Sequence, residues 1–234
     1  MSEIPRRALL GGALVAAAST MVTSTADAQY VWQKSAWPAA DLDTLARVQR
    51  RIKQAVHAHD INGGRFLNNT KNALNGLLLG TGIAANQIQL VCALNGPANM
   101  LNYSDYVWQK YRVGEWAKVT DPKTGEPALR NIYYPSRAGA EMKYASTDPS
   151  SPDSSNQDAT VQGLQARGVR FLSCHTSTEE TARALVRQNN LSGDPETVVK
   201  DMQAHTIPNV LIVPSMAAAL ALLQGDGRYS YVSV

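Results

Sequence analysis

The order of apolar and polar positions along the chain predicts strands and helices in alternation. Residues 52–61 alternate like a half-buried strand, and residues 87–94 form an apolar run typical of a strand covered on both faces. Leucines at helical spacing predict a helix over 65–79. Further helices are predicted at 41–51, 98–111, 161–166, 178–189, from 194 onward and at 215–223, and further strands at 169–173, 210–213 and 229–232.

This alternation favours right-handed crossovers and a mainly parallel sheet. We therefore expect residues 29–234 to form a single α/β domain of three layers, with helices on both faces of the sheet. Residues 112–160 interrupt the rhythm, because they contain a turn-forming stretch at 121–125 and a segment at 146–160 that is rich in Ser, Asp and Pro. We interpret 112–160 as a long, partly mobile insertion and not as a second domain.

The first 28 residues have the pattern of a cleavable export signal. Arg6 and Arg7 precede an apolar run at 8–18, and Ala26-Asp27-Ala28 forms an A-x-A cleavage site. The arginine pair before a short, moderately apolar segment favours the twin-arginine type, with an ordinary secretory signal as the alternative. The apolar run is too short to span a bilayer, so the sequence predicts a periplasmic or secreted protein with no membrane attachment after cleavage.

Charge and motif content exclude several functions. The chain has 22 Lys and Arg residues against 19 Asp and Glu residues, and the part after residue 28 keeps a net charge of +3. So small an excess, without a basic stripe, argues against nucleic-acid binding. The absence of a Gly-rich phosphate loop and of a G-x-S-x-G motif argues against a P-loop NTPase and an α/β-hydrolase. The sequence indicates no cofactor.

A parallel α/β sheet binds ligands beyond the carboxyl ends of its strands. Cys174 follows the strand at 169–173 and precedes a helix whose first turn carries two capping boxes. The positive end of a helix dipole stabilises a thiolate, so Cys174 is the candidate catalytic residue, with a small buried structural cysteine as the alternative. Four further candidate binding residues lie at strand ends: His59, Asn95, Gly96 and His175.

The remaining Cys and His residues leave alternatives open. Cys92 lies within the apolar run at 87–94 and reads as structural, although a Cys92–Cys174 disulfide would suit an oxidising compartment. On the strand predicted at 52–61, His57 and His59 share one face at a spacing that suits a metal, but no further ligand completes a set, so we predict no metal site. His205 reads as an ordinary surface residue.

Several segments resemble one known family. Residues 168–174 (GVRFLSC), 207–215 (IPNVLIVPS) and 223–232 (LQGDGRYSYV) resemble the DsrE/DsrF-like sulfur-relay family, and residues 105–114 (DYVWQKYRVG), 121–127 and 130–131 are similar to an exported branch with twin-arginine signals. The resemblance covers about residues 50–234. It implies a largely parallel sheet of five strands, assembly as a homo-oligomer (trimer or hexamer), and a persulfide carried on Cys174. The relay proteins are cytoplasmic, whereas this chain has a predicted export signal.

Three hypotheses on function follow. In the first, Cys174 accepts sulfane sulfur from a small sulfur species, as a sulfurtransferase-like carrier. In the second, the protein is a non-catalytic oligomeric binding protein for a small ligand or a metal. In the third, aromatic residues hold a neighbouring subunit, and the alternative is that they cover the domain's own core; these residues are Trp108, Tyr111, Trp116, Tyr133 and Tyr134.

Overall fold

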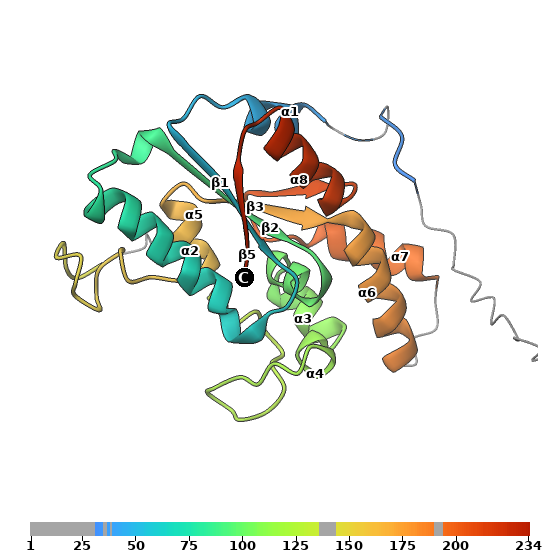
Figure 1. The fold of residues 1–234 in the computed structure, drawn as a ribbon. Helices are drawn as coiled ribbons and strands as arrows, with labels where there is room; N and C mark the ends of the chain where they lie inside the picture. The colour runs from blue at the N-terminus through green and yellow to red at the C-terminus, as the bar shows by residue number, and fades with distance from the viewer. Residues whose placement is uncertain (1–30, 35–36, 38, 136–143, 190–193) are drawn as a thin grey trace, which may run out of the picture.

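Five parallel strands form one sheet in the order β4-β3-β2-β1-β5, as the computed structural model shows (Figure 1). The structure describes residues 31–34, 37, 39–135, 144–189 and 194–234, so the predicted export signal lies outside the described residues. The strands are β1 (Ile52–Ala58), β2 (Ile88–Leu94), β3 (Arg170–Cys174), β4 (Val210–Val213) and β5 (Ser230–Ser233). The predicted five-stranded parallel α/β fold is confirmed.

Helices cover both faces of this sheet (Figure 1). On one face lie α1 (Ala40–Arg47) and α8 (Met216–Gly225), whose buried side chains form one apolar cluster with Val91, Ala93 and Leu172. The larger cluster on the other face is built from α2 (Arg65–Asn75), α3 (Asp105–Lys110), α4 (Val113–Trp116), α5 (Val161–Ala166), α6 (His175–Gln188) and α7 (Pro195–Ala204). Three layers therefore bury the sheet on both sides, which explains why the middle strand, β2, is apolar at every position but one.

Two predicted helices are interrupted in the structure. The helix predicted at 65–79 is α2 followed by a π-helical turn, η2 (Gly76–Gly80). The helix predicted at 98–111 is a 3₁₀-helix, η4 (Gly96–Asn102), followed by α3. Residues three apart share a face of a 3₁₀-helix, and this spacing directs both Asn99 and Asn102 toward backbone carbonyls of β3. Two short 3₁₀ turns, η1 (Asn62–Gly64) and η3 (Ala85–Gln87), complete the helical elements.

The first strand ends earlier than the sequence predicts. β1 stops at Ala58, and the chain then turns into Gly63 and Gly64, which both have positive φ angles. His59 therefore lies beyond the strand, and the expectation that it shares a strand face with His57 is wrong.

Part of the segment interpreted as an insertion is built into the core. Val113, Val119 and Ala128 are buried in the larger cluster. The turn between them is held by two hydrogen bonds from the Arg130 guanidinium to the Asp121 carboxylate, at 2.7 and 2.9 Å. This guanidinium holds the pKa of Asp121 below its ordinary value. The loop is thus packed on the domain at least over 112–135.

The aromatic residues between 108 and 134 cover the domain's own core. Trp108 and Tyr111 are buried, and Trp116, Tyr133 and Tyr134 pack against the same cluster while partly exposed. The Trp108 indole N–H donates to the Met100 carbonyl at 3.0 Å. Trp108 and Tyr111 therefore belong to the core, whereas a contact of the partly exposed rings with a neighbouring subunit stays a prediction.

Candidate functional site

Cys174 closes β3 and serves as the N-cap residue of α6, so its predicted place between a strand end and a helix start is confirmed. The two predicted capping boxes are wrong, because α6 begins at His175 without a side-chain cap and Thr176 and Ser177 lie within its first turn. Its Sγ lies on the α8 side of the sheet, where it accepts a hydrogen bond from the Met216 backbone N–H at 3.3 Å. The Thr176 hydroxyl lies 3.0 Å from Sγ. The residue is only 2% exposed. The thiol thus has polar neighbours, a main-chain N–H and a hydroxyl, inside an otherwise apolar cluster.

A buried network of polar side chains, which we call the asparagine network, fixes the backbone at this point. Asn99 accepts the Cys174 backbone N–H at 2.9 Å and donates to the Cys174 carbonyl at 3.2 Å. The Asn99 side-chain amide therefore provides hydrogen-bond partners for both the backbone N–H and the backbone carbonyl of Cys174 at the strand-to-helix junction. The network consists of Asn99, Asn102, Tyr103, Ser173 and Thr178.

The asparagine network was not predicted from the sequence. The signal available was the pair Asn99 and Asn102 directly after a buried strand, since asparagine is rarely buried without hydrogen-bond partners. Burial raises the pKa of the Tyr103 hydroxyl above its ordinary value, which keeps the network uncharged.

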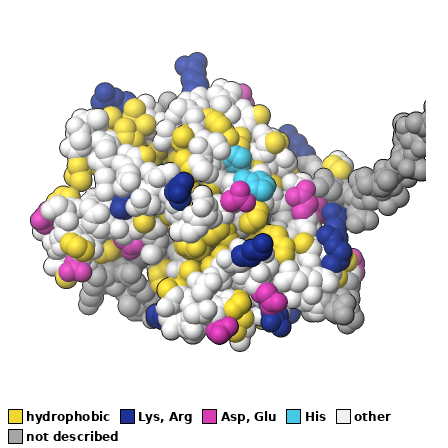
Figure 2. All heavy atoms as spheres, turned by 60° about the horizontal axis from the view of Figure 1, so that its bottom comes forward, with side chains coloured by type: hydrophobic (Ala, Val, Ile, Leu, Met, Phe, Trp, Pro, Cys, Tyr) yellow, Lys and Arg dark blue, Asp and Glu magenta, His cyan; other side chains and the backbone are white. Residues whose placement is uncertain are grey.

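His57, in β1, and His59, just after it, lie at the carboxyl edge of the sheet, and among the described residues they belong to no group of side chains that could hold a metal ion. His57 bridges Tyr231 and Asn95, with its Nδ1 at 2.8 Å from the Tyr231 hydroxyl and its Nε2 at 2.9 Å from Asn95 Oδ1. In Figure 2, histidine side chains gather at one point of this face beside an acidic side chain. The Asn95 side chain is thus bound to His57.

His59 and Gly96 form a close contact between two strand ends. A Cβ atom at Gly96 would lie 2.6 Å from Nε2 of the exposed His59 side chain, and Gly96 has a φ of +51°, a backbone conformation that favours glycine. The Gly96 N–H donates to Ser177 Oγ at 3.1 Å. These contacts join the ends of β1 and β2 to α6, and the Gly96 N–H is already engaged in the hydrogen bond to Ser177.

His175 faces α7, whereas Cys174 faces α8. His175 Nδ1 lies 2.6 Å from Gln203 Nε2, and because the amide nitrogen donates, Nδ1 is the acceptor. The imidazole ring of His175 also lies against Trp32, with ring centroids 4.3 Å apart. Glu179 Oε1 is 3.8 Å from Nε2. The two residues are neighbours in sequence, but they serve opposite layers of the fold.

The burial of His175 predicts a pH-dependent stability. Burial lowers the pKa of His175 from its ordinary 6.5, with Glu179 and Glu196 acting in the opposite direction. The unfolded chain therefore binds this proton more readily, so stability is present above pH 6.5 and is lost as the pH falls below it. We expect this group to lower the free energy of unfolding by up to about 1.4 kcal/mol per pH unit, as measured by urea denaturation between pH 8 and 5.

The variant His175→Gln should flatten this slope, since glutamine carries no titratable proton in this range. His59→Gln provides the matched control, because the His59 side chain is 61% exposed. Equal slopes in the wild type and in His175→Gln would contradict the prediction.

The two cysteines lie on opposite faces of the sheet. Cys92 belongs to the cluster under α2, where Thr70 Oγ1 is 3.6 Å from its sulfur, while Cys174 belongs to the cluster under α8. The suggested Cys92–Cys174 disulfide is therefore wrong, because the sheet separates the two thiols. Burial raises the pKa of Cys92 to about 12, which fits the structural role predicted for it.

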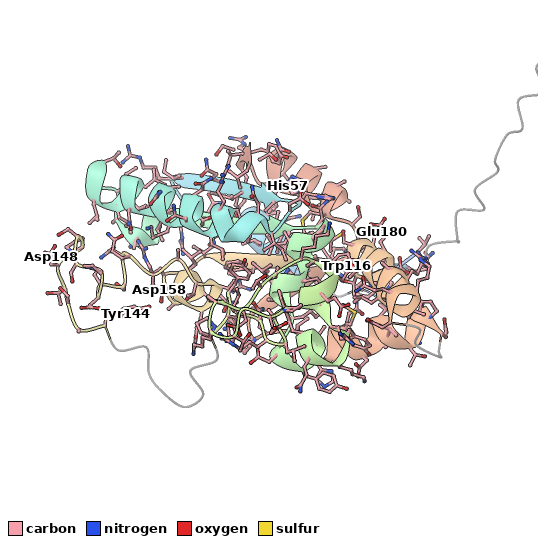
Figure 3. The ribbon with its side chains drawn as sticks, turned by 90° about the horizontal axis from the view of Figure 1, so that it is seen from below. His57, Trp116, Tyr144, Asp148, Asp158 and Glu180 are labelled. Carbon is pink, nitrogen blue, oxygen red and sulfur yellow. The ribbon has the colours of Figure 1, made fainter. Side chains whose placement is uncertain are left out.

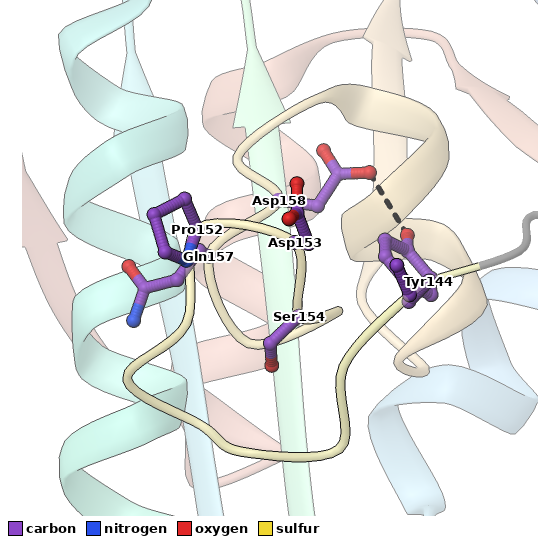
Figure 4. A pocket seen from close by; sticks show the side chains of 7 residues that line it. Tyr144, Pro152, Asp153, Ser154, Gln157 and Asp158 are labelled. Carbon is purple, nitrogen blue, oxygen red and sulfur yellow. Dashed lines mark hydrogen bonds between the residues drawn. The ribbon is translucent and has the colours of Figure 1, made fainter.

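A polar cavity lies in the segment 144–158, far from the carboxyl edge of the sheet where Cys174 lies. It has a volume of about 290 Å³ and is lined by Tyr144, Asp153 and Asp158 among others (Figure 4). Asp158 already accepts hydrogen bonds from the Tyr144 hydroxyl at 2.9 Å and the Thr160 N–H at 2.8 Å. Figure 3 separates His57 clearly from Tyr144 and Asp158. This cavity is thus no part of the thiol site.

Within the described ranges, no group of three or more His, Cys, Asp or Glu side chains is placed to hold a metal ion. None of the helices in the described part of the chain has the length and apolar character needed to cross a membrane. The sheet and its two helix layers make this an all-parallel α/β protein of three layers, with a cysteine at the end of one strand. Comparisons of the chain with protein-family models, with curated proteins and with solved structures find no match.

Proposed function

We propose that the protein accepts a sulfane sulfur atom on Cys174 and carries it as a persulfide. The hydrogen bond from the Met216 N–H to Sγ carries this proposal. Because Cys174 caps α6 and Met216 begins α8, the amino ends of two helices meet at one sulfur atom. Helix amino ends favour negative charge, and the thiolate is the nucleophilic form of cysteine.

Access to the sulfur depends on Thr176. This residue is partly exposed, and its hydroxyl lies directly against Sγ. The proposal requires a rotamer change of this threonine that lets a small reactant reach the sulfur. Rotamer changes of partly exposed side chains take place in picoseconds to nanoseconds.

The step balances without a further oxidant. The Cys174 thiolate attacks one sulfur atom of an inorganic polysulfide, and a new S–S bond forms to Sγ. An S–S bond of the polysulfide breaks, and its electron pair leaves with the shortened polysulfide. The attacked sulfur atom stays on Cys174 as the outer atom of the persulfide, and the sulfur atom at the end of the leaving fragment takes up the electron pair and is reduced, so no further oxidant is needed.

The other predicted site residues take no part in this step. Asn95 is hydrogen-bonded to His57, the Gly96 N–H to Ser177, and His175 faces α7. Their contribution is to hold the strand ends around the thiol. The sulfur step therefore rests on Cys174, Thr176 and the Met216 N–H.

Intact-mass measurement tests the proposal. After incubation with inorganic polysulfide and desalting, the wild type should gain the mass of one sulfur atom, and a thiol reductant should remove it. Cys174→Ser should gain none, whereas Cys92→Ala should gain as much as the wild type, because Cys92 is fully buried. Circular dichroism verifies that both variants are folded. An unchanged mass in the wild type, or an equal gain in mass in Cys174→Ser, would contradict the proposal.

Three further expectations stay predictions of the sequence. They are export through the signal at 1–28, assembly as a trimer or hexamer, and membership of the DsrE/DsrF-like family. The five-stranded parallel sheet agrees with the fold that the resemblance implies.

A further inference from the structure

Three polar side chains that take no part in the sulfur step are joined by hydrogen bonds at the carboxyl edge of the sheet. The Tyr231 hydroxyl lies 2.8 Å from His57 Nδ1, and His57 Nε2 lies 2.9 Å from Asn95 Oδ1. The three residues belong to β5, to β1 and to the position directly after β2. A phenol, an imidazole and an amide thus form one hydrogen-bonded chain, which we call the phenol relay.

The backbone holds the members of the phenol relay in place. Tyr231 belongs to the parallel ladder that pairs β5 with β1 (Figure 1). The Val234 N–H donates to the His57 carbonyl at 3.1 Å, and the Asn95 N–H donates to the Ala58 carbonyl at 3.2 Å. Because strands and strand ends carry the three side chains, their mutual geometry is more precise than free loops would provide.

The bonding pattern sets the protonation state of the His57 ring. The side-chain oxygen of Asn95 only accepts hydrogen bonds, so His57 Nε2 carries the imidazole proton. The other nitrogen of a neutral imidazole is unprotonated, so His57 Nδ1 accepts the hydrogen bond from the Tyr231 hydroxyl. His57 is therefore placed to take the phenol proton, and Asn95 sets the tautomer that allows this transfer.

This order of groups matches an activated nucleophile. A hydroxyl group becomes nucleophilic when a base within about 2.6 to 3.2 Å takes its proton and a third group orients the base. Both hydrogen bonds of the phenol relay fall within this range. Tyr231 is also 43% exposed, so a reactant can reach its hydroxyl from solvent.

The other tyrosines that the structure describes lack this arrangement. Tyr106 and Tyr144 donate to carboxylate oxygens of Asp201 and Asp158, and a neighbouring carboxylate disfavours a second negative charge on the phenol. For the remaining phenols burial raises the pKa above its ordinary value, and these are Tyr103, Tyr111, Tyr133, Tyr134 and Tyr229. Among the described tyrosines, Tyr231 alone combines an exposed ring with a hydrogen bond to an imidazole.

We infer that Tyr231 accepts an acyl group from an activated acyl compound, with His57 as the general base. The phenol relay contains no cationic side chain that could neutralise the oxygens of a phosphoryl or sulfuryl donor. An uncharged carbonyl carbon makes no such demand, which favours acyl donors as the substrate class. The inference is independent of the sulfur step at Cys174.

The acyl transfer balances without an oxidant or a further reactant. The Tyr231 oxygen attacks the carbonyl carbon of the donor, and a new C–O bond forms while the phenol proton passes to His57 Nδ1. The bond between the carbonyl carbon and the leaving group breaks, and its electron pair goes to the leaving group. The leaving group takes the proton from His57, and Tyr231 carries the acyl group as an aryl ester.

Acetylation by N-acetylimidazole at neutral pH tests the inference. Peptide mass spectrometry measures the acetyl group gained at each tyrosine of the folded wild type over time. Tyr106 is the internal reference, since it is 41% exposed and its hydroxyl accepts a hydrogen bond from Lys110 Nζ at 2.6 Å. Tyr231 should react about tenfold faster than Tyr106 or more, because a general base contributes roughly 100-fold or more at developed catalytic sites.

Two histidine variants separate base catalysis from exposure. His57→Gln should lower the Tyr231 rate about tenfold or more, because glutamine accepts the hydrogen bond of the phenol but does not take its proton. His59→Gln is the matched control, since the His59 side chain is exposed and pairs with Asp60, and the Tyr231 rate should stay unchanged. Equal rates at Tyr231 and Tyr106 in the wild type, or an unchanged Tyr231 rate in His57→Gln, would overturn the inference.

Two substitutions of Asn95 test the role of the tautomer. Asn95→Ala should lower the Tyr231 rate, whereas Asn95→Asp should retain it, because a carboxylate also accepts the Nε2 proton and leaves Nδ1 free to act as the base. An equal loss in both variants would contradict this role.

Cys174→Ser separates this chemistry from the sulfur step. The Tyr231 rate in Cys174→Ser should equal that of the wild type, even if polysulfide adds no sulfur to the protein. Loss of acetylation in Cys174→Ser would show that the acyl group passes through the thiol, and it would overturn direct attack by Tyr231. Circular dichroism verifies that each variant is folded.

Discussion

Replacement of Asn99 by alanine is expected to lower the free energy of unfolding by about 3 to 4 kcal/mol. The side chain is fully buried and serves both backbone atoms of Cys174 together with Ser173 and Thr178. Alanine leaves the Cys174 main-chain N–H buried without a partner and removes the Asn99 oxygen that accepts the Ser173 hydroxyl, and each such buried group costs roughly 1 to 3 kcal/mol, whereas the Cys174 carbonyl keeps its hydrogen bond from the Thr178 hydroxyl at 2.9 Å. Urea denaturation followed by circular dichroism measures the loss.

Asn72→Ala serves as the matched control for this variant. Asn72 lies on the exposed side of α2, where alanine is a better helix former than asparagine. Its substitution should change the free energy of unfolding by no more than about 0.5 kcal/mol. If Asn99→Ala proved as harmless as Asn72→Ala, the asparagine network would not be what fixes the β3–α6 junction.

Gly114→Ala is expected to be nearly as damaging, with a loss of about 3 kcal/mol. Alanine normally stabilises a helix relative to glycine, but Gly114 in α4 packs directly against the backbone of Ala128. An added Cβ would overlap the carbonyl oxygen and the amide nitrogen of Ala128. That backbone cannot move aside easily, because the Ala128 N–H donates to the Val119 carbonyl at 2.8 Å. Thermal and urea unfolding should both detect the change.

Gly76→Ala provides the contrasting case. Gly76 has a helical φ of −59°, is exposed, and has no atom within 4 Å of the position that a Cβ would take. The same substitution should therefore stabilise the protein by up to about 1 kcal/mol. A destabilised Gly76→Ala, or a neutral Gly114→Ala, would show that the close approach of α4 to Ala128 is not a feature of the folded protein.

The alternating pattern of the sequence predicted the fold class well. Buried parallel strands are continuous apolar runs, so the segments 87–94 and 210–213 coincide with β2 and β4 to within one residue. The order of strands in the sheet has no such local signal. It depends on which helices pack together, and only the structure establishes it.

The polar sites were harder to predict from the sequence than the fold class, because their residues come together through long-range contacts. Cys174 was identifiable because a strand end, a cysteine and a helix start are adjacent in sequence. Asn99 was not, because its partners lie more than seventy residues away.

The sheet between the two cysteines limits what oxidation can do to this chain. With Cys92 beneath one layer of helices and Cys174 beneath the other, the molecule has no internal partner with which its strand-end thiol could cross-link. Any lasting covalent change at that sulfur must be brought by a second molecule. Monomers exposed to oxidants should consequently yield adducts or linked dimers, and never a closed intramolecular loop.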